Sequence, residues 1–179
     1  MRLQTLGAVL MLVIGIAAAA PAQEVPQLDV LADEILVALQ NYYPVHATEM
    51  GIHEYDHRFA DYSPAAVKEM IRKLTGFQKR LAPMANKAMS ADQSVRYNLL
   101  RSNVEIALLD LRDIAWHKRL PQLYIDEAVN GLYLLLNSQH APMEEKVVPL
   151  MARIAAVPRL FLSAKNNIKT PPKIWIDEG

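Results

Sequence analysis

The spacing of apolar residues limits this chain to helices more firmly than any other feature of its sequence. From residue 28 to residue 168, apolar side chains recur three and four positions apart, and no stretch alternates with a period of two. Such spacing places side chains on one face of an α-helix, whereas a half-buried strand requires strict alternation. We therefore predict an all-α fold, an antiparallel array of five or six helices.

Prolines and caps divide this pattern into segments. Pro44 ends the first helix, because proline lacks an amide donor and disfavours helix at the preceding residue. A short turn over about residues 45–50 is expected to follow and to end at Gly51. Ser63-Pro64 and Ser90 are start signals for the next two helices. The expected inward faces are Leu28, Leu31, Ile35, Leu39 and Tyr42 in the first helix, Val67, Ile71, Leu74, Phe77 and Leu81 in the second, and Val95, Leu99, Ile106, Leu109 and Ile114 in the third.

Two further segments complete the array. Residues 123–136 are apolar on nearly all sides, which predicts a helix that is buried over most of its surface. The last helical region runs over about residues 142–168, where Pro149 and Pro158 predict a kink or two shorter helices packed end to end. The tail, residues 173–179, carries large apolar side chains that need cover, so we expect another helix to begin there in a longer protein.

The first 22 residues have the composition of a secretory signal peptide. Arg2 precedes an apolar run over residues 6–19, and Ala20-Pro21-Ala22 offers a cleavage site. A retained membrane anchor is the alternative, since the start of the chain carries a single positive charge. We expect an exported protein, periplasmic or secreted, whose residues 23–179 form a helical and incomplete domain. Membrane contact is expected only through the signal segment before cleavage.

Composition and missing motifs exclude several classes of function. The chain has no Cys, which excludes disulfides, thiolate metal sites and Cys nucleophiles. It carries 19 Lys and Arg against 19 Asp and Glu, so nucleic acid is not an expected partner. No G-x-S-x-G string and no glycine cluster occurs, which removes support for a serine hydrolase or a nucleotide-binding protein.

One segment, His53-Glu54-Tyr55-Asp56-His57, matches the HExxH string of zinc hydrolases. That motif works on a helix, which presents both imidazoles on one face with the Glu as general base. Here Gly51 precedes the string and turn-forming residues 61–64 follow it, so we predict a loop. Glu69 is the best available third ligand and lies on an exposed helix face. We therefore assign no catalytic, cofactor-binding or metal-binding residue in this chain.

The other histidines have plain interpretations. His46, His53 and His57 could bind a metal from a loop together with nearby carboxylates, namely Glu54, Asp56 and Asp61. A solvated polar loop anchored by Tyr55 and Phe59 is the preferred interpretation. His117 and His140 stand near predicted helix ends, where imidazole can bond terminal carbonyls or simply remain exposed.

Several spaced motifs resemble the N-terminal half of the bacterial domain-of-unknown-function 885 family. Residues 44–63, from Pro44 through the HEYD string to Ser63, resemble its N-terminal signature. Later segments agree in order over residues 28–179, namely Trp116 before Pro121 and Tyr124, Gly131-Leu132-Tyr133, Arg153-Ile154 before Val157-Pro158, and residues 164–168 before Pro171-Pro172 and Trp175.

The resemblance implies a helical, exported, zinc-peptidase-like protein whose metal motif lies in a C-terminal half beyond this chain. It implies a scaffold role here, with one wall of a substrate cleft and no catalysis by this region alone. Zinc would then belong to a full-length protein. The expected partners are the C-terminal half or another helical surface, and a peptide substrate.

Two alternatives remain open. The first is a self-contained periplasmic helical binding or interaction module that uses the region from Tyr42-Tyr43 to Phe59 as an aromatic surface. The second is a small metallohydrolase built on His53, Glu54 and His57.

Overall fold

The computed structural model describes residues 25–169 and 171–172, and these residues form an all-α fold without any strand. The prediction of five or six helices is confirmed. The expected signal peptide and the expected tail helix lie outside the described residues. The six helices are α1 (Pro26–Tyr42), α2 (Pro44–Glu49), α3 (Pro64–Leu81), α4 (Ala91–Leu108), α5 (Gln122–Asn137) and α6 (Met143–Asn167).

Short helical turns join several of these helices. A 3₁₀ turn, η1 (His53–Tyr55), follows α2, and a second, η2 (Ala82–Met84), follows α3. The end of α4 widens into a π-helical turn, η3 (Leu109–Asp113), and a 3₁₀ turn, η4 (Trp116–Lys118), precedes α5. These turns account for several changes of direction, whereas an extended connection over residues 58–63 joins η1 to α3.

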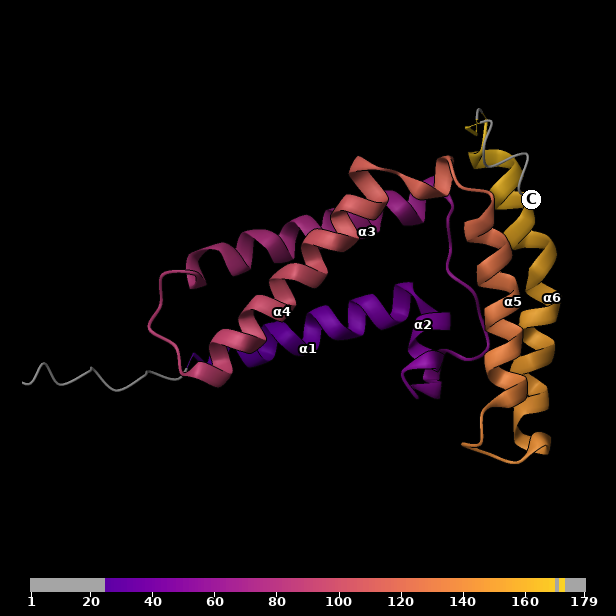
Figure 1. The fold of residues 1–179 in the computed structure, drawn as a ribbon, viewed down its shortest axis with the longest axis horizontal. Helices are drawn as coiled ribbons and strands as arrows, with labels where there is room; N and C mark the ends of the chain where they lie inside the picture. The colour runs from indigo at the N-terminus through magenta and orange to yellow at the C-terminus, as the bar shows by residue number, and fades with distance from the viewer. Residues whose placement is uncertain (1–24, 170, 173–179) are drawn as a thin grey trace, which may run out of the picture.

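Helices α1, α3 and α4 pack into a three-helix body with its own apolar core (Figure 1). The predicted face of α1 is confirmed, since Leu28, Leu31 and Ile35 are fully buried and Leu39 and Tyr42 pack against the core. The predicted face of α3 is confirmed in the same way. Ser63 caps α3 by accepting from the amide of Ala66, and Ser90 caps α4 by accepting from the amide of Gln93.

The predicted face of α4 is wrong. Val95, Leu99, Ile106 and Leu109 are exposed, and Ile114 is partly buried. This helix carries apolar residues on two sides, and contact with α1 and α3 determines which side is buried. The buried residues of α4 and η3 are Gln93, Tyr97, Leu100, Val104, Ala107, Leu108 and Leu111.

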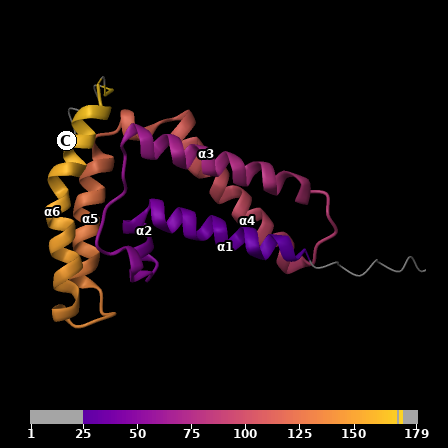
Figure 2. The same cartoon turned by 180° about the vertical axis from the view of Figure 1, so that it is seen from behind.

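Helices α5 and α6 form a pair that stands across one end of this body (Figures 1 and 2). Helix α2 and the extended connection between η1 and α3 pack against the pair. A second apolar core lies among these parts. Its buried members are Val45, Phe59, Ala60, Tyr62, Tyr124, Ala128 and Leu160. We call this region the second lobe.

Three expectations for these segments are corrected. Residues 45–50 do not form a simple turn, because Pro44 occupies the first turn of α2 and starts a new helix there. Helix α5 is not buried on most sides, since only one face packs inward and Ile125, Val129 and Tyr133 are exposed. Pro149 and Pro158 lie within one continuous helix, α6, so the alternative of two shorter helices packed end to end is wrong.

Helix α6 is the one described helix that is long and apolar enough to cross a membrane by length and composition. Its middle, however, carries Arg153, which is fully buried and bonded to three other parts of the chain. This side chain fixes one face of α6 against the rest of the second lobe, while most of the helix surface is exposed.

Candidate functional site

The HExxH segment does not have the geometry of a zinc-hydrolase motif. Only His53–Tyr55 is helical, as a single 3₁₀ turn, and Asp56 and His57 continue as a turn. Glu54 and His57 are exposed, whereas Tyr55 and Asp56 are buried. The prediction of a loop anchored by Tyr55 and Phe59 is confirmed, but the prediction that it is solvated is wrong for Asp56, which is buried and accepts from Thr48. His53, Glu54 and His57 therefore do not fit a zinc-hydrolase site.

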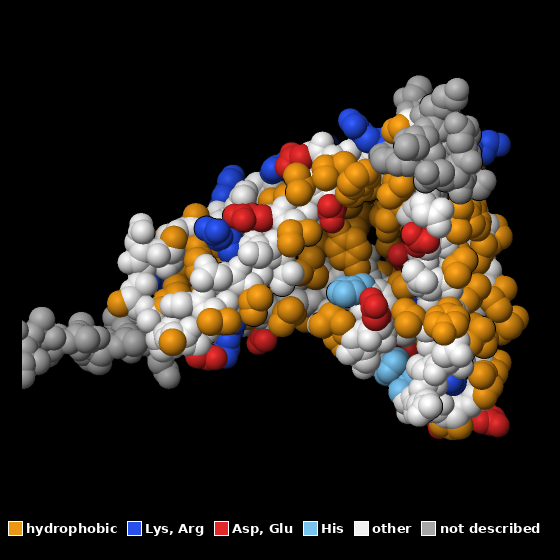
Figure 3. Space-filling model, in the orientation of Figure 1, with side chains coloured by type: hydrophobic (Ala, Val, Ile, Leu, Met, Phe, Trp, Pro, Cys, Tyr) orange, Lys and Arg blue, Asp and Glu red, His pale blue; other side chains and the backbone are white. Residues whose placement is uncertain are grey.

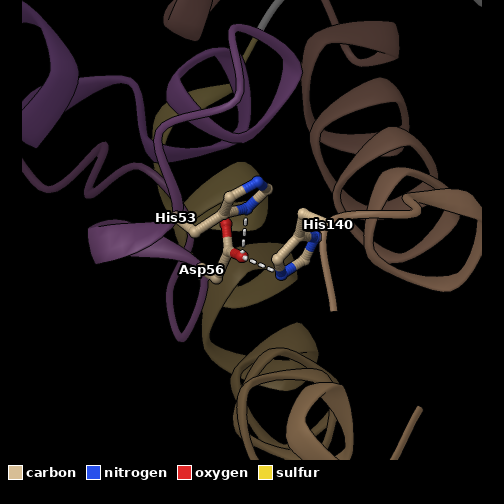
Figure 4. A group of neighbouring side chains, drawn as sticks. All are labelled: His53, Asp56 and His140. Carbon is tan, nitrogen blue, oxygen red and sulfur yellow. Dashed lines mark hydrogen bonds and ion pairs between the residues drawn. The ribbon is translucent and has the colours of Figure 1, made fainter. Parts of the chain in front are cut away.

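His53 instead lies beside Asp56 and His140 (Figure 4). The Nδ1 atom of His53 is 2.8 Å from Asp56 Oδ2, and the Nε2 atom of His140 is 4.0 Å from the same oxygen. The two imidazoles are stacked, with centroids 3.4 Å apart and planes inclined by 13°. The fold thus joins two residues from the loop after α2 to one residue from the connection between α5 and α6.

Lys146 positions that connection. Its side chain is buried and its ammonium donates to the carbonyls of Leu136 and Ser138, the latter at 2.7 Å. These carbonyls lie at the C-terminal end of α5, where backbone acceptors lack partners within the helix. Ser138 Oγ also lies 2.8 Å from His140 Nδ1. The turn that presents His140 is therefore fixed from both sides.

Arg153 is the centre of the polar network beneath this cluster. Its guanidinium is fully buried, and it donates to acceptors on α2, on the connection before α3 and on α5. The acceptors are the carbonyl oxygens of Pro44, Arg58 and Gly131 and the hydroxyl oxygen of Thr48. A planar guanidinium with five N–H donors suits this role.

Thr48 connects Arg153 to the cluster of His53, Asp56 and His140. Its hydroxyl accepts from Arg153 at 2.7 Å and donates to Asp56 Oδ1 at 2.6 Å. Burial lowers the pKa of Arg153, and the carboxylates of Asp56 and Glu127 oppose that shift. Arg153 thus supplies the positive charge that a buried Asp56 requires.

Glu127, on α5, occupies the other side of this network. It accepts from the backbone amide of Ala60 at 2.8 Å. Burial raises the pKa of Glu127, while the Ala60 amide and Arg153 oppose the rise. Burial also raises the pKa of the nearby Tyr62 well above its ordinary value of 10.0. The raised pKa of Glu127 makes this acid a candidate functional group of the second lobe.

His117 belongs neither to the cluster of His53, Asp56 and His140 nor to the polar network around Arg153. It is buried in η4, and its Nδ1 has no hydrogen-bond partner in the described chain. Burial lowers its pKa, and Lys118 adds to that effect. Its backbone carbonyl accepts from the Tyr124 hydroxyl at 2.6 Å. The ring therefore fills space, and the carbonyl holds η4 against α5.

A largely apolar groove of about 410 Å³ lies between α1, α2 and α4. Its wall includes Ile106 from the exposed face of α4, together with Tyr43 and Met50. Hydrophobic side chains also gather in the hollow between the three-helix body and the α5–α6 pair (Figure 3). The groove between α1, α2 and α4 is the best candidate in the described chain for a surface that contacts an apolar partner or substrate.

Sequence reasoning missed Arg153, Thr48 and His140. Arg153 carries no clear local signal, because Arg159 also stands among apolar residues of α6 and is exposed. Nothing local indicates that His140 lies beside His53, because these residues are far apart in the sequence. None of the other residues weighed as loop ligands, His46, Glu54, His57 and Asp61, belongs to the cluster.

Fold and site together define an all-α protein whose second lobe is organised around a buried arginine. Residues 44–179 match the family described as "Bacterial protein of unknown function (DUF885)", and the chain belongs to this family. No curated protein and no solved structure matches the chain.

Proposed function

We propose that this chain is the exported helical N-terminal region of a zinc-dependent, peptidase-like protein. In this role it supplies scaffold and one wall of a substrate cleft, and it is not catalytic alone. The match over residues 44–179 supports the family, and the resemblance of the spaced motifs to the family's N-terminal half is the ground for the proposed placement. The absence of a zinc-hydrolase geometry at His53 and His57 agrees with a catalytic centre elsewhere.

The number of exposed apolar side chains on α4, α5 and α6 is the observation that carries this proposal. So many large hydrophobic side chains are unusual on a surface that faces water alone. The occupant we propose is the catalytic helical half of the same protein. The exposed residues are Val95, Leu99, Ile106 and Leu109 on α4, Ile125, Val129, Tyr133 and Leu136 on α5, and Met143, Val147, Val148, Met151, Ile154, Phe161 and Leu162 on α6.

The alternative of an aromatic binding surface has less support. Phe59 is buried against Gly131, and Tyr42 and Tyr43 are partly buried with their rings 4.9 Å apart. These rings therefore contribute to packing between the body and the second lobe, and they do not form an open aromatic platform.

The first test is the coding sequence that follows Gly179. We expect the reading frame to continue into a second HExxH-type string, and the protein expressed from the whole frame to hydrolyse peptides in a zinc-dependent manner. Residues 1–179 alone should show no hydrolysis. A stop codon directly after Gly179, or hydrolysis by this chain alone, would contradict the proposal.

A pair of variants in that longer protein tests the groove. Ile106→Glu places a charge in the wall of the cleft and should raise KM for a peptide substrate severalfold. Val30→Glu is the matched control, because Val30 is exposed to a similar extent, 59% against 56%, and does not line the groove. Equal KM values for the two variants would show that the groove does not contact the substrate.

A further inference from the structure

The side chains of His53, Asp56 and His140 converge without any role in the function proposed above. Their potential ligand atoms all lie within 4.8 Å of one another (Figure 4). The side chain of Asp56 is 6% exposed, and those of His53 and His140 are 28% and 26% exposed. The cluster is thus partly covered but still open to solvent on one side.

We propose that these three side chains bind a divalent transition-metal cation of the zinc type. Neutral imidazole nitrogens and a carboxylate oxygen are the ligands that zinc accepts in proteins without cysteine. Three protein ligands leave one tetrahedral position for water or for another donor. The bound cation would join the loop after α2 to the connection between α5 and α6.

The ligand atoms lie close enough for such an ion to reach all three once the side chains rotate. Metal–ligand bonds of about 2.1 Å in a tetrahedral site place neighbouring ligand atoms roughly 3.4 Å apart. The two distances to Asp56 Oδ2, 2.8 Å and 4.0 Å, lie on either side of that value, each by about 0.6 Å. The two rings are stacked nearly parallel, so binding also requires His53 and His140 to rotate about their side-chain bonds until both lone pairs face one ion.

Hydrogen bonds behind the cluster orient two of the three ligands. Asp56 Oδ1 accepts from Thr48, which leaves Oδ2 free to face the imidazoles. When His140 Nδ1 donates to Ser138 Oγ, the lone pair of Nε2 faces Asp56 Oδ2. Two electron-rich atoms that face each other need a cation or a proton between them. Such outer hydrogen bonds are a regular feature of metal-binding histidines.

The site differs from the HExxH hypothesis in a way that variants can separate. Both hypotheses use His53, so a His53 variant does not distinguish them. A zinc-hydrolase pair requires His57, which is exposed and outside the cluster. The proposed site requires His140 instead. His46, which pairs with Glu49 on the exposed surface of α2, serves as a second histidine control.

The experiment is a titration of the purified full chain, without a histidine tag, with Zn²⁺ alone by isothermal calorimetry. We expect one equivalent to bind, and Co²⁺ to give visible absorption bands at the same stoichiometry. His140→Gln should weaken Zn²⁺ binding at least tenfold, whereas His57→Gln and His46→Gln should bind as the unaltered chain does. Circular dichroism without metal checks that each variant keeps its helices.

Two results would overturn the proposal. The first is that the unaltered chain does not bind Zn²⁺, as expected if only a proton bridges the cluster. The second is that Zn²⁺ binding survives His140→Gln and is lost in His57→Gln. Ser138→Ala adds a finer test, since it removes the partner of His140 Nδ1 and leaves all three ligands in place. Zn²⁺ should bind this variant about 10-fold to 100-fold more weakly, and unchanged affinity would contradict the proposed orientation of His140.

Discussion

The three-helix body and the second lobe are built on different physical principles. In the body, α1, α3 and α4 meet through an apolar core, and charged pairs such as Arg80 with Glu34 and Arg96 with Asp29 stay on the surface. In the second lobe a smaller apolar core surrounds Arg153, which is fully buried. Hydrophobic burial alone is enough to order the body, whereas the second lobe also requires a satisfied polar network.

The largest effect in this comparison is expected from Arg153→Met. The change removes the cation that is bonded to α2, α5 and the connection before α3, and it leaves Asp56 without a buried counter-charge. Breaking a buried charge interaction costs about 3–5 kcal/mol, so we expect the free energy of unfolding to fall by that amount in urea denaturation. Arg159→Met is the control on the same helix, because its pair with Asp61 is exposed and is expected to contribute about 0–1 kcal/mol. Similar losses for both variants would refute the role of Arg153.

The next effect concerns close packing in the second lobe. A Cβ atom at Gly131 would lie 2.5 Å from a ring carbon of Phe59 and 3.0 Å from a methyl group of Val45. Gly131→Ala should therefore destabilise the protein by about 1–3 kcal/mol, as overpacked cores do.

Gly76→Ala is the matched control in the body. Nothing lies within 4 Å of the position that its Cβ would occupy, and the residue is in the interior of α3. This variant should raise the free energy of unfolding by about 0.5–1 kcal/mol, because alanine favours helix. If the two glycine variants shifted stability in the same direction, the difference in packing between the two regions would not hold.

A smaller effect on stability is expected from pH through the buried His117 in η4. Burial lowers the pKa of His117 below its ordinary value of 6.5, so below that pH the unfolded chain binds more protons than the folded chain. Stability should therefore fall as the pH drops from 6.5 toward the lowered value. In His117→Leu this part of the pH dependence should vanish, as measured by urea denaturation between pH 5 and about pH 8. An unchanged pH profile would show that His117 titrates normally in the folded state.

The smallest effect is expected on the outer face of α4. Leu99→Gln should change the free energy of unfolding by no more than about 0.5 kcal/mol, since Leu99 is 60% exposed. Leu100→Gln, one position along, buries an amide in the core of the body and should cost several times more. A large loss of unfolding free energy in Leu99→Gln would show that the face predicted from the sequence is the buried one.

Most of the three-helix body can be predicted from the sequence, and the wrong prediction for the buried face of α4 has a clear cause. Periodicity finds the inward face of α3, whose large apolar residues lie on one side, and it also finds that of α1, although Val30, Leu36 and Val37 are exposed on that helix. Helix α4 has two apolar faces, one through Leu100 and Val104 and one through Leu99 and Ile106. Spacing alone cannot choose between them, since the choice depends on where α1 and α3 lie.

The candidate site was much less predictable. The loop character of residues 53–57 follows from local turn signals and is confirmed. The bond between Arg153 and Thr48, by contrast, joins residues 105 positions apart, and the stacking of His53 on His140 depends on the same tertiary packing. No local rule encodes such long-range contacts, so the polar half of the second lobe emerges only from the folded structure.

The fold places His53 beside His140 and does not pair it with His57. The chain has only five histidines, so their ring protons can be assigned individually by NMR. We predict nuclear Overhauser cross peaks between the rings of His53 and His140 in the purified chain. Cross peaks between the rings of His53 and His57, with none between His53 and His140, would contradict the account.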